Sequence, residues 1–307
     1  METSLTAALV ALFLAAPPPP AHLTAKEAEL WGKLRARIEA VDRGLDGVLG
    51  VSVQDRKTGA TIDLRSDELF PTASSIKPAV LLELYAQAEA GSVDLLATTV
   101  PPTPRVGGGG VLESLGDKVS LTWHDLAVLM MGWSDNEATN VLIRRVGMDA
   151  VNRRLDALGL AKTRLRRQMM DLEAARRGNE NVTTPNELRR LLEAVEDGAG
   201  LSPARAADMR AVAAVQKWGT LTSGSQFRVP LPEDLKVLDK PGELEGVRCV
   251  GAFVELPGRP YSAAIMTTYL KRSSDGEAAI RAVSEAVYET FDRLARASDL
   301  GRVISEK

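Results

Sequence analysis

Hydrophobic positions near the start of the chain first follow helical spacing and then change to a strand pattern. Between Ala25 and Arg43 the apolar residues fall on one side of a helix, and they are Leu30, Trp31, Leu34, Ile38 and Val41. The apolar run Val48 to Val53 predicts a strand, and residues 55–59 have turn composition. Ala60 to Leu64 then predicts the returning strand of a hairpin.

The middle of the chain is almost entirely helical in pattern. Apolar spacing predicts a helix from Ile76 to Ala90, and a loop rich in Pro and Gly follows from Pro101 to Gly110. Further helical patterns cover residues 122–133, 137–147, 149–158 and 185–196. Thr184-Pro185 is typical of a helix start.

Strand patterns return in the last third, over Arg248 to Glu255 and Tyr261 to Leu270, before an amphipathic helix from Gly276 to Ala295. We therefore expect an α/β fold of the α+β type. The early and late strands form one antiparallel sheet covered by the terminal helices, and an all-helical lobe is inserted. Residues 23–307 are expected to form one domain, with a sheet lobe (23–66 and 216–307) and a helical lobe (67–215). A ligand site is expected in the cleft between the lobes.

Composition narrows the possible chemistry. The 307 residues are 45% hydrophobic, and 38 Lys plus Arg against 41 Asp plus Glu give a net charge of -3. A chain-wide basic surface is therefore absent, which argues against a nucleic-acid partner. One cysteine, Cys249, excludes an intramolecular disulfide and a Cys-rich zinc site. Because the only histidines are His22 and His124, we expect no metal centre, and a base other than histidine for any serine nucleophile.

An apolar run of 12 residues, Leu5 to Ala16, precedes four consecutive prolines. It is shorter than the about 20 residues of a membrane span and matches the core of a signal peptide. We therefore expect residues 1–22 to be a leader and the protein to be exported, either periplasmic or secreted. The leading segment carries Glu2 and no Lys or Arg, so a disordered leader or a misassigned start stays an alternative.

Three short motifs carry candidate chemistry, and the first is Ser74-Ser75-Ile76-Lys77. Ser74 and Lys77 are three residues apart at a helix start, so their side chains share one face. There a neighbouring amine can deprotonate the hydroxyl, and backbone N–H groups can hold an oxyanion. The alternative is a capping serine followed by a solvated lysine.

The second motif is Ser134-Asp135-Asn136, at the break between two helical patterns. It supplies a hydroxyl that can shuttle a proton and an amide that can bind substrate. The alternative is a cluster that caps the following helix.

The third motif is Lys240-Pro241-Gly242, just before the late strands. A second ammonium facing Lys77 is expected to lower the pKa of that lysine by like-charge repulsion and to attract a substrate carboxylate. The alternative is an ordinary lysine and turn glycine. Lys57-Thr58-Gly59 lies in the predicted hairpin turn and is expected to point away from the cleft.

The order of these motifs resembles that of the class A β-lactamases and penicillin-binding proteins, over roughly residues 25 to 297. Supporting matches are Gly109-Gly110-Val111-Leu112, Ala138-Thr139-Asn140 and Val182-Thr183-Thr184-Pro185. The resemblance implies a serine hydrolase that needs no cofactor and acts, as a monomer, on a small β-lactam or peptidoglycan-like substrate.

The resemblance also implies roles for individual residues. Ser74 is acylated with Lys77 as base or proton relay, and Ser134 passes a proton to the leaving nitrogen. Asn136 binds substrate and Lys77, and Lys240 binds the substrate carboxylate. The substrate-binding residues are Gly242, Glu243 and Arg248, with the N–H groups of Ser74 and Glu243 as the oxyanion hole and Arg248 at the carboxylate.

Two departures from the family pattern affect the expected activity. The position seventeen residues before Pro185, where the family has the glutamate that activates the deacylating water, is Gln168, and a second register gives Met169. Asp171 and Glu173 are the nearest carboxylates, and we expect a surface or loop-bracing role for both. The alternative is a shifted loop that brings Asp171 inward. Pro241 replaces a residue that normally carries a hydroxyl, and it confines its strand to an edge or a bulge.

Three functions are consistent with this pattern. The first is β-lactam hydrolysis with an atypical or weak deacylation step. The second is a penicillin-binding-type D-Ala-D-Ala peptidase, or another amidase or esterase. The third is a β-lactam-binding sensor without turnover.

Overall fold

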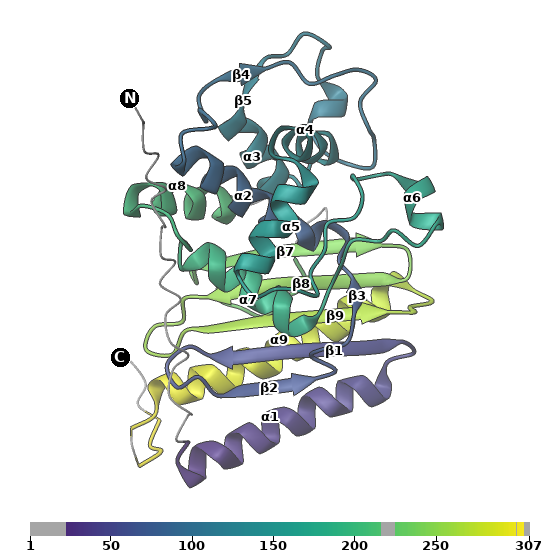
Figure 1. The fold of residues 1–307 in the computed structure, drawn as a ribbon. Coiled ribbons are helices and arrows are strands. Elements are labelled where there is room, and N and C mark those ends of the chain that lie inside the picture. Colours follow the sequence, from purple (N-terminus) through teal and green to yellow (C-terminus); the bar gives the residue numbers. More distant parts are fainter. Residues whose placement is uncertain (1–22, 216–224, 299, 304–307) are drawn as a thin grey trace, which may run out of the picture.

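One antiparallel sheet organises the chain, with helices on both of its faces (Figure 1). The computed structural model describes residues 23–215, 225–298 and 300–303, so the expected leader 1–22 lies outside the described residues. The strand order is β2-β1-β9-β8-β7, which places β7 at an edge. The strands are β1 (Val48–Asp55), β2 (Thr61–Leu64), β7 (Val237–Leu244), β8 (Val247–Val254) and β9 (Tyr261–Thr268).

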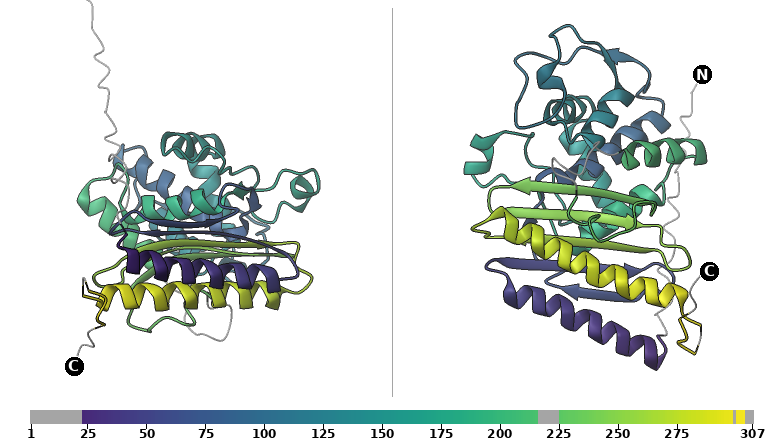
Figure 2. Two further views of the ribbon diagram at one scale, coloured as in Figure 1. Left: turned by 90° about the horizontal axis from the view of Figure 1, so that it is seen from below. Right: turned by 180° about the vertical axis from the view of Figure 1, so that it is seen from behind.

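The two terminal helices, α1 (Ala25–Gly44) and α9 (Ser273–Arg296), lie side by side on one face of the sheet (Figure 2). Thr24 caps α1 through a capping box with Glu27. Trp31 of α1 meets Phe291 of α9 edge to face, with ring centroids 5.8 Å apart. The pairing of early and late strands under terminal helices confirms the expected fold.

The remaining helices lie on the opposite face and continue away from the sheet beyond β7 (Figure 1). They are α2 (Lys77–Glu89), α3 (Trp123–Gly132), α4 (Asn136–Val146), α5 (Met148–Ala157), α6 (Leu172–Arg176), α7 (Pro185–Glu196) and α8 (Pro203–Ala214). Short elements connect them, namely β3 (Phe70–Pro71) paired with β6 (Val182–Thr183), β4 (Thr98–Thr99) paired with β5 (Leu121–Thr122), and the 3-10 turns Ala73–Ile76 and Leu112–Ser114.

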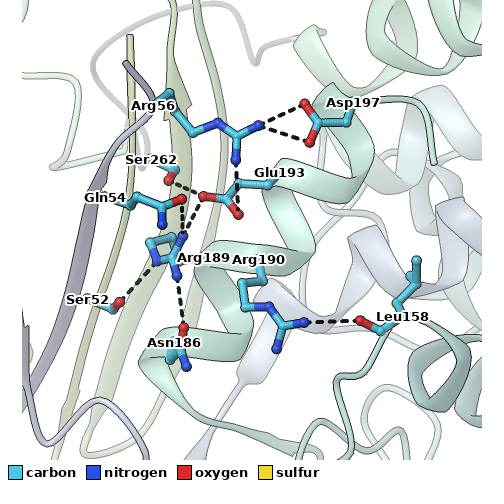
Figure 3. Close-up of polar contacts among 10 residues, drawn as sticks. All are labelled: Ser52, Gln54, Arg56, Leu158, Asn186, Arg189, Arg190, Glu193, Asp197 and Ser262. Carbon is cyan, nitrogen blue, oxygen red and sulfur yellow. Dashed lines mark hydrogen bonds and ion pairs between the residues drawn. The ribbon is translucent and has the colours of Figure 1, made fainter. Parts of the chain in front are cut away.

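Helix α7 joins this helical part to the sheet. A Cβ added at Gly251 of β8 would come within 2.6 Å of Leu192, so the glycine lets α7 pack against the strand. Arg189 donates to Ser52 of β1 at 3.0 Å and to Glu193 at 2.5 Å, and Glu193 also accepts from Ser262 of β9 (Figure 3). Both charged residues are buried, so this network fixes α7 on the strands.

Most predicted elements appear within a few residues of their expected bounds. Helix α2 begins at Lys77 because residues 73–76 form a 3-10 turn instead of a regular helical turn. Helices α6 and α8 were not expected from the apolar pattern. Among the described residues, no helix is long and apolar enough to cross a membrane, and no His/Cys/Asp/Glu cluster could hold a metal ion.

Candidate active site

Ser74 lies in the 3-10 turn that leads from β3 into α2. The turn begins with Ala73 in the left-handed region at φ 47°. Lys77 follows as the first residue of α2, and its side chain is fully buried. Pro78 suits the first turn of a helix, where a backbone N–H needs no partner within the helix. The sequence therefore places the hydroxyl and the amine one turn apart at the start of α2.

The ammonium of Lys77 points at the Ser134-Asp135-Asn136 segment. It donates to the carbonyl oxygen of Ser134 at 2.6 Å, to Ser134 Oγ at 3.0 Å and to Asn136 Oδ1 at 3.1 Å. The alternative of a solvated lysine at position 77 is therefore wrong. A buried lysine held by three oxygens can exchange protons with the hydroxyl beside it.

Ser134 and Asp135 have different tasks in this segment. Ser134 adopts φ 54°, which turns the chain sharply between α3 and α4. Asp135 caps α4 through Ala138 N at 2.8 Å, and its second oxygen accepts from Val111 N and Leu112 N. The capping interpretation is thus correct for Asp135, while Ser134 and Asn136 face Lys77.

Lys240 reaches the same hydroxyl from the sheet. Its ammonium lies 3.0 Å from Ser134 Oγ and 3.1 Å from the carbonyl of Pro241, and the residue is 2% exposed. The structure thus brings both amines of the first and third motifs to the hydroxyl of the second. Lys57, by contrast, is exposed in the turn between β1 and β2.

Strand β7 lies directly against the turn that carries Ser74. A Cβ at Gly242 would lie 2.4 Å from the carbonyl oxygen of Thr72 and 2.9 Å from the nitrogen of Ser75, so this position requires glycine. Glu243, the next residue, is exposed. The edge position of β7 accommodates Pro241, as the sequence required.

Arg248 is the cross-strand partner of Glu243, but its side chain lies on the face of the sheet covered by α9. It donates to Glu277 of α9 at 3.3 Å and to the carbonyl of Leu244 at 2.9 Å. A pocket of about 220 Å³ lies here, lined in part by Ser225, Glu243, Arg248 and Glu277. Arg248 therefore borders a pocket that Gly242 and Cys249 also line.

The loop between α5 and α7 places Met169 beside α4. The side chain of Asn140 accepts from Met169 N at 2.7 Å and donates to Met169 O at 3.1 Å. Met169 is 6% exposed, whereas Gln168 is half-buried. Asp171 is exposed and caps the short helix α6 through Ala174 N at 2.9 Å.

Arg167 in the same loop is buried and donates to Glu180 at 2.9 Å. The side-chain oxygen of Asn181 accepts from the backbone N–H groups of Arg166 and Arg167, which holds the loop backbone beside this ion pair. The partner lies 13 positions further along the chain, so no local charge pattern indicated it.

Known proteins resemble this chain over most of its length. The family model described as the beta-lactamase enzyme family matches residues 33–291. A β-lactamase of Streptomyces albus G is 32% identical over 253 residues, covering 79% of this chain and 78% of the relative. A β-lactamase of Streptomyces fradiae is 31% identical over 298 residues, covering 93% and 92%.

Solved structures give the same result. The β-lactamase of Sphaerobacter thermophilus superposes with a TM-score of 0.76 at 28% identity, covering 85% of this chain and 97% of that one. The L158E mutant of PBP-A, an acyl-enzyme complex with penicillin G, gives a TM-score of 0.77 at 25% identity, covering 89% and 98%. The fold is that of the class A β-lactamase-like serine hydrolases. The chain belongs to the β-lactamase enzyme family.

Two buried residues of the site were not identified from the sequence. Asn140 was part of a supporting match without a role, and Cys249 was considered only as a possible disulfide or metal ligand. Cys249 Sγ lies 3.0 Å from the carbonyl of Thr72. The only available signal was its position in an apolar strand, which is typical of any core residue.

Proposed function

We propose that the protein hydrolyses β-lactams through an acyl-enzyme on Ser74 and releases the acyl group slowly. The observation that carries this proposal is the convergence of Lys77 and Lys240 on Ser134 Oγ, beside the turn that bears Ser74. This arrangement surrounds one reaction centre with a nucleophile, a proton acceptor and a proton donor.

Acylation begins when Ser74 Oγ attacks the β-lactam carbonyl and transfers its proton to Lys77 in its neutral amine form. The C–O bond forms, the lactam C–N bond breaks, and Ser134 donates its proton to the leaving nitrogen. Lys77 then returns a proton to Ser134 across their 3.0 Å contact, so no proton is gained or lost.

The oxyanion of the tetrahedral intermediate is assigned to the N–H groups of Ser74 and Glu243. The close approach of Gly242 to Thr72 and Ser75 supports this assignment, because it brings the two segments together. Lys240 is the proposed partner of the substrate carboxylate. Arg248 is the proposed second partner of that carboxylate, and Glu277 holds its guanidinium at 3.3 Å.

The release step lacks an evident base. Asn140 holds the backbone of Met169, and neither this thioether nor the amide of Gln168 can take a proton from water at neutral pH. Asp171 is exposed and caps α6. We therefore expect the acyl-enzyme to accumulate.

A penicillin-binding-type peptidase or transferase is the second candidate, and Met169 is the observation that favours it. Acylation needs no group at this position, whereas fast hydrolysis of the ester does. A peptide substrate could extend along β7, whose outer edge has no strand partner among the described residues.

Mixing the protein with a chromogenic cephalosporin and with penicillin G, followed by intact-mass spectrometry over time, tests the proposal. We expect a burst of colour, a slow steady rate and a persistent adduct. A fast linear rate without an adduct would contradict slow release, and an adduct without any turnover would favour the second candidate. An unmodified and inactive protein would overturn both.

The apolar run Leu5 to Ala16 supports export as a further proposal. Fractionating cells that express the chain with and without residues 1–22 tests it. Equal distribution of the two forms would rule out a signal function.

A further inference from the structure

A buried sulfur joins the turn that carries Ser74 to the strand that carries Glu243. Cys249 of β8 is the cross-strand partner of Gly242 and is 1% exposed. Its Sγ lies 3.0 Å from the carbonyl oxygen of Thr72 and 3.5 Å from that of Gly242. The Gly242 carbonyl and the Glu243 N–H belong to one peptide group, so the sulfur touches the two segments that supply the proposed oxyanion donors.

Ser75 contacts the same carbonyl from inside the turn. Its Oγ donates to Thr72 O at 2.7 Å and its backbone N–H at 3.0 Å. Ser75 Oγ also lies 3.4 Å from Cys249 Sγ, and Ser75 is fully buried. Thr72 O is therefore fixed both by its own turn and by the neighbouring strand.

The turn needs such support because its backbone is strained. Ala73 has φ 47°, in the left-handed region that residues with a Cβ rarely adopt. Ala73 separates Thr72 from Ser74, so any relaxation at Ala73 rotates the peptide group whose N–H belongs to Ser74. Contacts on both sides of the strained residue keep that N–H in place.

The thiol is chemically suited to donate. Burial raises the pKa of Cys249 from 9.0 to about 11, so the group is an S–H at neutral pH. Its single hydrogen can serve Thr72 O, the shortest of its contacts. The absence of a Cβ at Gly242 leaves room for the sulfur, since a Cβ there would lie 2.7 Å from Sγ.

We propose that Ser75 and Cys249 form a clamp that positions the oxyanion hole built from the N–H groups of Ser74 and Glu243. Both are positioning residues, because they act through the peptide groups of Thr72 and Gly242. This inference rests on the proposed acyl-enzyme function, and it adds two residues whose side chains control the rate of acylation from behind the site.

Four variants test the clamp. Cys249→Ala and Ser75→Ala each remove one donor to Thr72 O, whereas Cys249→Ser keeps a donor. Val250→Ala is the matched control, because Val250 is also buried in β8 but packs in the core beneath the terminal helices.

Hydrogen exchange measures the clamp without any substrate. Peptides covering residues 72–77 and 241–245 are expected to exchange faster in Cys249→Ala and Ser75→Ala than in the wild type. Val250→Ala and Cys249→Ser are expected to leave both peptides near wild-type protection. Unchanged exchange in both alanine variants would overturn the proposal.

Acylation by penicillin G measures the functional consequence. Loss of an entire oxyanion donor costs about 10²–10³ in rate, and misplacement costs less, so we expect about a 10-fold slower acylation in Cys249→Ala. The loss is expected in the maximal rate and not in KM, and Cys249→Ser should recover most of it. Wild-type rates in both alanine variants would overturn the proposal.

The two measurements also separate this inference from the proposed function. A wild-type protein that penicillin G does not acylate would overturn the acyl-enzyme, while the exchange experiment would still decide whether the clamp exists. Ser75→Ala repeats the test without altering β8, in case Cys249→Ala does not fold.

Discussion

The ammonium groups of Lys77 and Lys240 both lie 3.0 Å from one oxygen, the hydroxyl of Ser134. A serine hydroxyl has two lone pairs and one hydrogen, so accepting from both lysines leaves its hydrogen free to donate. The two lysines come from different parts of the fold, one from the start of α2 and one from the edge strand β7. Ser134 Oγ is therefore hydrogen-bonded to one lysine from the helical part and to one from the sheet.

Ser134→Ala should therefore slow acylation, because it removes both the proton donor and the oxygen shared by the lysines. A positioned acid or base contributes about 10²–10⁴ in rate, and we expect a loss of about 10²-fold. Stopped-flow measurement with a chromogenic cephalosporin checks it. Ser114→Ala, at an exposed serine, is the control, and a wild-type rate in Ser134→Ala would remove Ser134 from the proton path.

Met169→Glu should shorten the lifetime of the acyl-enzyme. Asn140 holds the backbone at this position, so the new carboxylate enters at a fixed point of the loop. We expect release to become about 10-fold faster or more, since a base can now take a proton from water. Following the penicillin G adduct by intact mass gives the lifetime.

Met169→Gln is the control for that experiment, because it has the shape of glutamate without its basicity. Equal lifetimes for the two variants would show that position 169 does not face the acyl group. A thermal melting scan of both variants measures any loss of stability that comes from placing a polar group in a buried position.

Arg189→Met should destabilise the fold. It removes the buried guanidinium that donates to Glu193 and leaves that carboxylate with Arg56, 3.4 Å away, as its cationic partner. Breaking a buried pair costs about 3–5 kcal/mol, and the contact with Arg56 should keep the loss near the lower end of that range. Urea unfolding measures the loss. Arg190→Met, on the same helix but bonded to the backbone carbonyls of residues 158 and 159, should cost about 1 kcal/mol.

Replacing both members of the pair adds a sharper test. The double variant Arg189→Met with Glu193→Met should recover part of the stability, because the buried carboxylate that has lost Arg189 is removed as well, while Arg56 keeps its contact with Asp197. A double variant that loses the sum of the two single losses would show that the pair does not act as a unit.

Cys249 should be inert at neutral pH and should make stability depend on alkaline pH. Its pKa is raised from 9.0 to about 11, so the folded state holds the thiol proton more tightly than the unfolded state. Stability should therefore fall between pH 9 and 11, and more in the wild type than in Cys249→Ala. Urea unfolding across this range checks the slope, and equal slopes would contradict the raised pKa.

Sequence patterns predicted the fold where apolar periodicity decides the structure. Trp31, Leu34 and Ile38 form the buried side of α1 as their spacing indicated. Helix α8 was missed because its alanine-rich segment has no distinct apolar stripe and is positioned by packing against α3 and α2. The position of α8 therefore depends on tertiary packing, which the periodicity of apolar residues does not encode.

In the candidate site, too, some features could be predicted from the local sequence and others depend on tertiary contacts. The motif order predicted a site of Ser74, Lys77, Ser134 and Lys240, because motif order and spacing can be read from the chain alone. The structure brings Lys77, Ser134 and Lys240 into contact. The burial of Arg167 by Glu180 and the contact of Cys249 with Thr72 depend on partners far along the chain. No local pattern encodes such contacts, so only the structure reveals them.

The proposed function depends above all on acylation of Ser74 by a β-lactam. Peptide mapping of the wild type and of Ser74→Ala after exposure to penicillin G measures this directly. The wild type should gain the mass of one intact penicillin molecule on the peptide containing residues 73–77, and Ser74→Ala should gain none. A label on another peptide, or one that survives Ser74→Ala, would contradict the claim.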